Sequence, residues 1–321
     1  MTKIITKRTV FVLFTTIYER KLRVKTIDFN LTSLYILSGD SMKRMGNILE
    51  DAKQKKYAIP QFNINNLEWT KNILEACQKE NSPVFLGVST GAVKYMGGYN
   101  VVRQMVDGLI RDLGITIPVI LHLDHGTSVD ECKKAVDANF DSIMIDASHY
   151  DLETNIKMTN EVINYAKDQL IEAELGTIGG TEDEVTGNLQ FTKLDDAIEF
   201  IKNVNIDLLA PSLGSVHGLY KSKPDIQFDL MNQIFNAVNT PLVLHGGTGL
   251  SDEIIRKSIS LGICKININT EFQVAWNEAI RDFINKNPNE YDPRKIISSG
   301  AAAIRDVATQ KIHLLGSNNK G

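Results

Sequence analysis

Short runs of β-branched and aliphatic residues alternate with longer runs of helical periodicity from Met45 onward. Eight of the short runs predict strands, over Tyr57–Ile64, Pro83–Val88, Pro118–Leu123, Ser142–Asp146, Leu170–Leu175, Asp207–Ala210, Pro241–Leu244 and Cys264–Ile268. Such alternation is typical of a parallel sheet, and eight units in one chain favour a closed (β/α)8 TIM barrel, an α/β fold, over an open sheet. Since no G-x-G-x-x-G follows the first strand, a dinucleotide-binding fold is disfavoured.

Patterns with helical periodicity separate the predicted strands. They cover Leu67–Lys79, Val101–Leu113, Ser128–Asn139, Leu152–Asp168, Leu194–Asn203, Asp229–Val238, Asp252–Leu261 and Glu271–Lys286, and a C-terminal helical extension is expected at Pro293–Thr309. Ser128, with Glu131 three residues later, has the spacing of a capping box, which marks the start of a helix. The Gly-rich, acidic segment over residues 176–188 is predicted to be a loop.

Composition narrows the range of functions. The chain has 321 residues, 43% of them hydrophobic and 23% charged, which is a globular composition. Its net charge of −4 argues against nucleic-acid binding, which needs a basic face. No apolar run approaches the ~18 residues of a membrane span. The three cysteines form no C-x-x-C pair, so we expect free thiols in a reducing compartment and a cytoplasmic protein.

The first 41 residues differ in charge from the rest. They contain seven Lys/Arg and three Asp/Glu, whereas the remainder contains 28 and 36. The stretch Thr9–Phe14 is apolar, but charged Glu19-Arg20-Lys21 follows it and there is no small-residue cleavage site. We therefore expect no signal peptide. Either this segment is a basic extension that touches a partner or a membrane, or translation starts at Met42 or Met45. We favour the second alternative, because domain patterning begins only at Met45, and expect residues 1–44 to lie outside a single domain over 45–321.

Three of the six histidines follow predicted strands. His125 comes after the third strand, His217 after the sixth and His245 after the seventh, and each precedes a glycine. Active sites of TIM barrels lie at the carboxyl ends of the strands. A single histidine there is more often structural, but three at one end of a barrel are typical of a catalytic zinc site with one open position. We interpret His122, His149 and His313 as supporting or structural residues. We expect His313 to lie on the surface.

The segment His122-Leu123-Asp124-His125-Gly126 places a carboxylate beside a candidate metal ligand. Successive side chains of a strand point to opposite faces, so Asp124 and His125 would diverge in a regular strand. Both can face one substrate only if the strand end twists or bulges, and Gly126 is well placed to allow this. We therefore expect His125 to bind a metal and Asp124 to transfer a proton.

Two segments, after the seventh and the eighth strand, suit an anion. Gly246-Gly247-Thr248-Gly249 offers backbone N–H groups that can converge, and Asn267-Ile268-Asn269-Thr270 follows the next strand. The first segment could be merely a tight turn. Because the loops after strands seven and eight are the usual phosphate site of this fold, we expect phosphate binding here.

The acidic segment after the fifth strand contains a candidate base. Gly179 and Gly180 precede Glu182 and could act as a hinge that brings its carboxylate over the site. A solvated acidic loop is the simpler interpretation. A carboxylate can, however, abstract a proton next to a carbonyl that a metal has polarised. A metal, a phosphate site and a mobile carboxylate together suggest enolate chemistry on a phosphorylated ketone.

This pattern resembles the class II, metal-dependent fructose-1,6-bisphosphate aldolases, in the shorter bacterial branch that also contains tagatose-bisphosphate aldolases. The resemblance runs from about Met45 to the C-terminus and rests on many motifs in the family's order. They are Gln61-Phe62-Asn63, Val88-Ser89-x-Gly91-Ala92-x-Lys94-Tyr95, His122-Leu123-Asp124-His125-Gly126, Glu174-Leu175-Gly176-x-x-Gly179-Gly180-x-Glu182-Asp183, Gly214-Ser215-Val216-His217-Gly218, His245-Gly246-Gly247-Thr248-Gly249, Lys265-Ile266-Asn267-Ile268-Asn269-Thr270-Glu271 and Tyr291-Asp292-Pro293-Arg294-Lys295.

The resemblance implies roles for the matching residues. A catalytic Zn²⁺ would polarise the carbonyl of dihydroxyacetone phosphate, held by His125, His217 and His245. Asp146 and Glu174 would belong to a second or alternative divalent-metal position. Glu182 would take the proton in condensation, and Asp124 would exchange a proton with the aldehyde oxygen. The ketone-side phosphate would bind Gly218, Gly246, Gly247, Thr248, Asn267, Ile268, Asn269 and Thr270.

Further substrate contacts are implied. Asn63 and Ser89 would touch the sugar, and Arg294 would reach the second phosphate from a neighbouring subunit, which implies a homodimer or homotetramer. The sequence departs from the family at Tyr220-Lys221-Ser222, where Tyr-Lys-Gly is common. If this position needs a positive φ, serine is strained there, which affects the loop and any monovalent-cation site beside it.

The implied reaction is the reversible cleavage of fructose 1,6-bisphosphate to dihydroxyacetone phosphate and glyceraldehyde 3-phosphate, as in glycolysis and gluconeogenesis. The nearest alternative substrate is the C4 epimer, tagatose 1,6-bisphosphate, although the Thr177–Asp183 segment and Tyr291-Asp292-Pro293-Arg294 look more like the fructose branch. A third alternative is a non-catalytic protein, for sugar-phosphate binding or surface adhesion, on the same scaffold. The intact Asp124 and Glu182 argue against it, because binding alone needs no proton-transfer groups.

Overall fold

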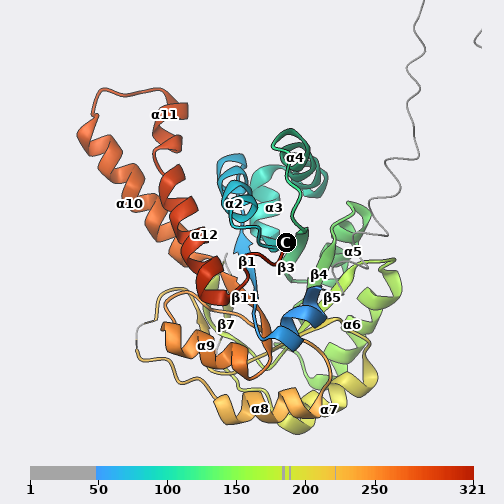
Figure 1. Ribbon diagram of the computed structural model, residues 1–321. Helices are drawn as coiled ribbons and strands as arrows, with labels where there is room; N and C mark the ends of the chain where they lie inside the picture. The colour runs from blue at the N-terminus through green and yellow to red at the C-terminus, as the bar shows by residue number, and fades with distance from the viewer. Residues whose placement is uncertain (1–47, 183–184, 188, 221) are drawn as a thin grey trace, which may run out of the picture. The chain divides into compact units, whose positions relative to one another are not determined.

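Eight parallel strands close into a barrel in the order β1-β11-β10-β8-β5-β4-β3-β2. The structure is a computed structural model, and it describes residues 48–182, 185–187, 189–220 and 222–321, with the backbone alone for 181, 182 and 185–187. The barrel strands are β1 (Ile59–Asn63), β2 (Val84–Ser89), β3 (Val119–Gly126), β4 (Ser142–Ile145), β5 (Leu170–Leu175), β8 (Leu208–Pro211), β10 (Leu242–Leu244) and β11 (Ile263–Ile268). Helices surround these strands (Figure 1), so the predicted TIM barrel is confirmed.

The helices follow the strands along the chain. Their bounds are α2 (Leu67–Lys79), α3 (Thr90–Met96), α4 (Tyr99–Asp112), α5 (Val129–Asp137), α6 (Leu152–Tyr165), α7 (Leu194–Asn203), α8 (Phe228–Ala237), α9 (Asp252–Ser260), α10 (Thr270–Lys286), α11 (Pro293–Ser298) and α12 (Ala301–Leu315). Ser128 caps α5, because its hydroxyl accepts a hydrogen bond from the Glu131 N–H at 3.2 Å, as its spacing predicts. Within the described ranges, no helix combines the length and the apolar character needed to cross a bilayer.

Two helix predictions are wrong in detail. The short helix α3 is absent from the prediction; Gly97 ends it at φ 101°, and Gly98 precedes α4. The single helix predicted over Pro293–Thr309 is α11 and α12, with Gly300 between them. A Cβ at Gly300 would lie 2.2 Å from the Trp276 ring, so glycine is needed for the close approach to α10.

The strands bury two different faces. Residues such as Leu86, Leu121 and Ile266 face outward and share one apolar cluster with the surrounding helices. Alternate residues, including Phe85 and Ile120, form a second cluster inside the barrel, which Leu49 of the helical residues 48–55 closes at one end. Above this apolar layer the interior becomes polar, with Gln61, His122, Glu172 and Lys265 fully buried. This polar layer lies beneath the carboxyl ends of the strands, where barrel sites form.

β3 ends in a bulge at the residues predicted to do chemistry. Its register against β4 shifts between Leu123 and Gly126, and His125 has φ 48°. The expected distortion is therefore confirmed, but the left-handed residue is His125 and not Gly126. A Cβ at Gly126 would lie 2.5 Å from the Met144 carbonyl oxygen and 2.6 Å from Cys132 Sγ, so this glycine serves close packing instead.

The acidic segment contains strands where a loop was predicted. β6 (Gly179–Glu182) pairs antiparallel with β7 (Val185–Gly187) and parallel with β9 (Val216–His217), which forms a small second sheet. A Cβ at Gly180, where φ is 95°, would lie 2.2 Å from the His217 carbonyl oxygen. The loop prediction is wrong here because the partner strand β9 is distant in sequence, and local periodicity does not reveal such pairing.

Candidate metal centre and active site

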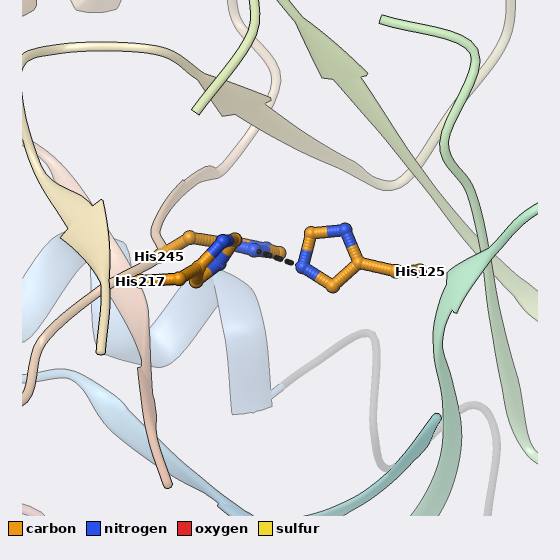
Figure 2. Close-up of side chains that lie close together, drawn as sticks. All are labelled: His125, His217 and His245. Atoms are coloured by element: carbon orange, nitrogen blue, oxygen red, sulfur yellow. Dashed lines mark hydrogen bonds between the residues drawn. The ribbon is translucent and has the colours of Figure 1, made fainter. Parts of the chain in front are cut away.

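The three histidines predicted to bind metal lie together. His125 comes from β3, His217 ends β9 and His245 follows β10. Ring centroids are 4.7 Å apart for His125 and His245, 4.9 Å for His125 and His217, and 5.8 Å for His217 and His245. Figure 2 shows the rings of His217 and His245 on one side and that of His125 opposite. One nitrogen of each ring lies within 4.8 Å of the others, so together they can hold a metal ion.

Hydrogen bonds direct two nitrogen lone pairs of this cluster toward each other. His125 Nδ1 lies 2.8 Å from Asp146 Oδ2, and His245 Nε2 lies 2.9 Å from Glu172 Oε1. An ionised carboxylate only accepts, so both nitrogens donate. His125 Nε2 and His245 Nδ1 then face each other across 3.0 Å (dashed line in Figure 2). A proton or a metal ion must lie between two such nitrogens, and with His217 as a third imidazole the donors suit zinc.

His125 also belongs to a second group of candidate ligands, with Asp146 and Glu174. Glu174 Oε2 lies 3.7 Å from His125 Nδ1 and has no hydrogen-bond partner among the described residues. Burial, followed by repulsion from Asp146, raises the pKa of Glu174 well above its usual range. A divalent cation bound here would satisfy this oxygen and offset the repulsion, so the group suits a second metal position.

The buried imidazoles differ in charge. Burial, followed by the neighbouring His125, lowers the pKa of His217 well below its usual value. Burial opposes protonation of His125 as well, but the hydrogen bond with Asp146 and the charge of Asp124 raise its pKa well above 6.5. His125 Nε2 therefore carries a proton that points at His245 Nδ1. A metal ion that binds these two nitrogens must displace this proton.

Asp124 is held by two amides at the same end of the barrel. Asn63 Nδ2 donates to Asp124 Oδ2 at 2.8 Å, and Asn267 Nδ2 donates to Asp124 Oδ1 at 3.3 Å. Burial opposes ionisation of Asp124, but the adjacent His125 and then His245 lower the pKa of this carboxyl below its ordinary value. Asp124 is thus a fixed, ionised carboxylate beside the histidines, which suits proton exchange with a substrate oxygen.

Glu182 is the last residue of β6, and the structure describes its backbone alone. Its strand runs beside β9, with Gly180 in register with the metal-ligand candidate His217. The strand that carries the predicted base therefore lies next to the histidine cluster. Its role as a base, and the hinge at Gly179 and Gly180, stay predictions.

The residues predicted to bind phosphate lie beside the histidines. Gly218 and Gly246 adopt positive φ of 86° and 66°. The Gly247 N–H donates to the Asn267 carbonyl at 3.0 Å, which joins the loop after β10 to the end of β11. Thr248 in this loop and Ile268 at the end of β11 are buried. Asn269 precedes α10, which begins at Thr270, and a helix N-terminus favours an anion.

The remaining predicted substrate residues are placed differently. Ser89 ends β2 in register with Asp124, and its Oγ accepts from the Ala92 N–H at 3.1 Å. Arg294 lies on α11, which projects from the barrel with α10 (Figure 1), and it pairs with Asp292 at 2.8 Å. Its side chain is 89% exposed and so is accessible to another subunit. Lys221 lies outside the described residues, so the effect of Ser222 stays a prediction.

Three contributors to this site were missed in the sequence. Glu172 contacts His245, Lys265 contacts Glu172 at 2.8 Å, and Tyr220 joins two loops. Glu172 is two residues before Glu174, and Lys265 is two before Asn267, so strand alternation could have placed both charges on the inner face. Tyr220 has no comparable signal, because its contacts depend on tertiary structure.

Replacing Tyr220 by phenylalanine should loosen the metal centre. The Tyr220 hydroxyl accepts from the Val216 N–H at 3.1 Å and donates to the Gly246 carbonyl at 2.9 Å, which ties together the segments that carry His217 and His245. Burial raises the pKa of Tyr220 to about 12, so the hydroxyl stays protonated. We expect a loss of about 1–2 kcal/mol in the free energy of unfolding and weaker zinc binding in a chelator competition.

Tyr99→Phe is the matched control for this change. It removes a hydrogen bond from the Tyr99 hydroxyl to Glu131, between α4 and α5, and touches no metal-ligand candidate. Zinc affinity should be unchanged in this variant. Equal zinc affinity in Tyr220→Phe and the wild type would show that the Tyr220 hydroxyl does not hold the metal centre together.

Comparisons with known proteins agree with this geometry. The family model described as "Fructose-bisphosphate aldolase class-II" matches residues 43–320. A fructose-bisphosphate aldolase of Geobacillus stearothermophilus is 50% identical over 283 residues, which cover 87% of this chain and 99% of that protein. Its counterpart in Staphylococcus epidermidis is 48% identical over 283 residues, which cover 87% of this chain and 98% of that protein.

A solved structure adds evidence at the level of the fold. The YdjI aldolase of Escherichia coli K12 superposes with a TM-score of 0.75 at 32% sequence identity, and the match covers 86% of this chain and 98% of that one. The family model spans the described barrel, and the relatives are matched over nearly their whole length. The chain therefore belongs to the class II fructose-bisphosphate aldolase family.

Proposed function

We propose that this protein catalyses the reversible aldol cleavage of fructose 1,6-bisphosphate to dihydroxyacetone phosphate and glyceraldehyde 3-phosphate. The observation that carries the proposal is the cluster of three histidines, with His125 Nε2 and His245 Nδ1 facing each other at 3.0 Å. Asp124 is held nearby by Asn267, whose Nδ2 donates to Asp124 Oδ1 at 3.3 Å. The names of the relatives from Geobacillus and Staphylococcus support fructose 1,6-bisphosphate as the substrate.

The catalytic metal in this proposal is Zn²⁺, with His125, His217 and His245 as its ligands. A bound divalent cation supplies a Lewis acid for the ketone carbonyl. With three imidazoles as ligands, such a cation would keep a position open to the substrate, as in catalytic zinc sites. Asp146 and Glu174 would provide ligands for a second or alternative divalent position. A monovalent cation beside Tyr220-Lys221-Ser222 is a further candidate cofactor.

Two carboxylates would move the protons. Asp124, ionised and fixed by Asn63 and Asn267, would accept the proton of the C4 hydroxyl during cleavage and return it during condensation. Glu182 would remove the proton from the carbon next to the ketone during condensation. The position of β6 beside β9 supports this assignment, because it carries Glu182 toward the strand of His217.

The substrate would be held by its two phosphates. The ketone-side phosphate would bind backbone N–H groups and hydroxyls of Gly218, Gly246, Gly247, Thr248, Asn267, Ile268, Asn269 and Thr270. Asn63 and Ser89 would contact the sugar. Arg294, exposed on α11, would bind the second phosphate in a neighbouring subunit of a homodimer or homotetramer. We place the enzyme in the cytoplasm, with one aldolase domain over residues 45–321.

The proposal is tested by comparing two sugars and two metal states. Cleavage of fructose 1,6-bisphosphate and of tagatose 1,6-bisphosphate is measured as kcat/KM, before and after removal of metal with EDTA. We expect a clear preference for the fructose sugar, loss of cleavage with EDTA, and recovery with Zn²⁺. A preference for tagatose would overturn the substrate. Cleavage that survives EDTA would overturn the metal mechanism and indicate a Schiff-base lysine.

A further inference from the structure

Lys265 is a lysine with no exposed surface inside the barrel. The register between β10 and β11 shifts at Cys264, so that Cys264 belongs to the inner apolar cluster while Lys265 reaches the polar layer above it. Its Nζ lies 2.8 Å from Glu172 Oε2, and the Glu172 side chain is also fully buried. A buried ion pair contributes little to stability compared with apolar residues of the same size, because both charges lose their hydration. Stability alone therefore does not explain this lysine.

One contact of Lys265 leads to the metal centre. Glu172 uses Oε2 for Lys265 and Oε1 for His245 Nε2, at 2.9 Å. Because the ammonium fixes one oxygen, the other is aimed at the imidazole, and His245 keeps its proton on Nε2. His245 Nδ1 then directs its lone pair toward His125 Nε2, 3.0 Å away. Burial would raise the pKa of Glu172, but the charge of Lys265 and the hydrogen bond with His245 together hold this pKa below its usual range.

A second contact of Lys265 leads, through Asn267, to the carboxylate of Asp124. Lys265 Nζ lies 3.0 Å from Asn267 Oδ1. A lysine only donates, so this contact fixes which end of the Asn267 amide is the oxygen. The amide nitrogen must then point the other way, toward Asp124 Oδ1 at 3.3 Å. A single ammonium group thus sets the orientation of a metal ligand through Glu172 and of Asp124 through Asn267.

His122 does not replace Lys265 as the charge partner of Glu172. His122 Nδ1 lies 2.8 Å from Ser142 Oγ, and His122 Nε2 lies 3.8 Å from Glu172 Oε2. Burial, followed by the charge of Lys265, lowers the pKa of His122 to about 3, so this imidazole is neutral at physiological pH. Glu172 consequently takes its compensating charge from Lys265 and not from His122.

We propose that Lys265 is a positioning residue that couples the metal centre to the proton-transferring carboxylate, by orienting His245 through Glu172 and Asp124 through Asn267. This inference rests on the zinc site of the proposed function. It adds a distinct expectation, namely that a residue without contact to metal or substrate controls both metal affinity and turnover.

The test compares Lys265→Met with the matched control Lys311→Met. Methionine keeps most of the length of the side chain and removes the charge. Lys311 forms an equally short pair, at 2.8 Å from Glu271, between α12 and α10, and its side chain is also largely buried. Zinc affinity is measured by chelator competition, and the ligand field by the visible absorption of Co²⁺-loaded protein. We expect roughly 10- to 100-fold weaker zinc binding and an altered Co²⁺ spectrum for Lys265→Met alone.

Turnover provides the second measurement. At saturating Zn²⁺, kcat of Lys265→Met should fall by about tenfold or more, because Asp124 loses its orientation. KM should stay close to wild type, because the contacts of the substrate are unchanged. If Lys265→Met does not fold, the uncharged double variant Lys265→Met/Glu172→Gln replaces it, with the same expected losses. A folded variant of either kind with wild-type zinc affinity and Co²⁺ spectrum overturns the inference. Failure of the wild type to bind zinc would instead overturn the proposed function.

Discussion

Replacing His125 by alanine should remove the metal and abolish aldol cleavage. His125 is a member of both groups of candidate ligands, so its loss leaves two imidazoles in one group and two carboxylates in the other. Zinc content should fall below about a tenth of an ion per chain, and kcat/KM should fall by about 10³-fold or more, since a metal supplies several kcal/mol to such a reaction. Metal analysis and the aldolase assay measure the two effects.

The substitution His125→Ala leaves the conformational strain of the backbone at this position unchanged. His125 has φ 48°, and alanine carries the same Cβ, so the strain of the left-handed conformation is present before and after the change. His313→Ala is the matched control, because His313 pairs with Glu80 on the surface at 2.8 Å, as expected for this residue. It should keep its zinc and its activity. A His125→Ala protein that retains one zinc ion per chain would refute the ligand assignment.

Replacing Asp124 by alanine should separate chemistry from metal binding. Asp124 contacts Asn63 and Asn267 and belongs to neither group of candidate metal ligands. The protein should keep its zinc, whereas kcat should fall by about 10²- to 10⁴-fold, the usual contribution of a general acid or base. The two amides lose their acceptor, so the free energy of unfolding should also fall by about 1–3 kcal/mol.

The contrast with His125→Ala makes this result informative. Zinc content, kcat and the free energy of unfolding are measured on the same preparation of each variant. If Asp124→Ala loses zinc in parallel with activity, its role is structural support of the metal centre. If it keeps both zinc and kcat, Asp124 does not transfer the proton.

The barrel could be predicted because its signal is local. Each strand is a short apolar run followed by helical periodicity, and predicted and observed bounds coincide for β5 and differ by one to three residues elsewhere. Strand ends are also local features, which is why His125 and His245 could be assigned to one end of the barrel. His217 was assigned to the same end, but it lies on β9 of the small sheet and not on a barrel strand.

The features that escaped prediction depend on contacts between distant residues. The pairing of β6 with β9 joins segments far apart in sequence, so the acidic segment was predicted as a loop. The distortion at the end of β3 was expected to be eased by Gly126, whereas the residue with positive φ is His125. The polar layer of Glu172 and Lys265 went unnoticed because charged residues within strands are ordinarily taken as solvent-facing.

The most direct test of the three-histidine site is a crystal structure of the zinc-loaded protein with anomalous diffraction at the zinc edge. The account predicts one strong anomalous peak within about 2.0–2.1 Å of His125 Nε2 and His245 Nδ1, with His217 as the third ligand. A zinc peak that these three histidines do not share, in protein that is active with Zn²⁺, would contradict it.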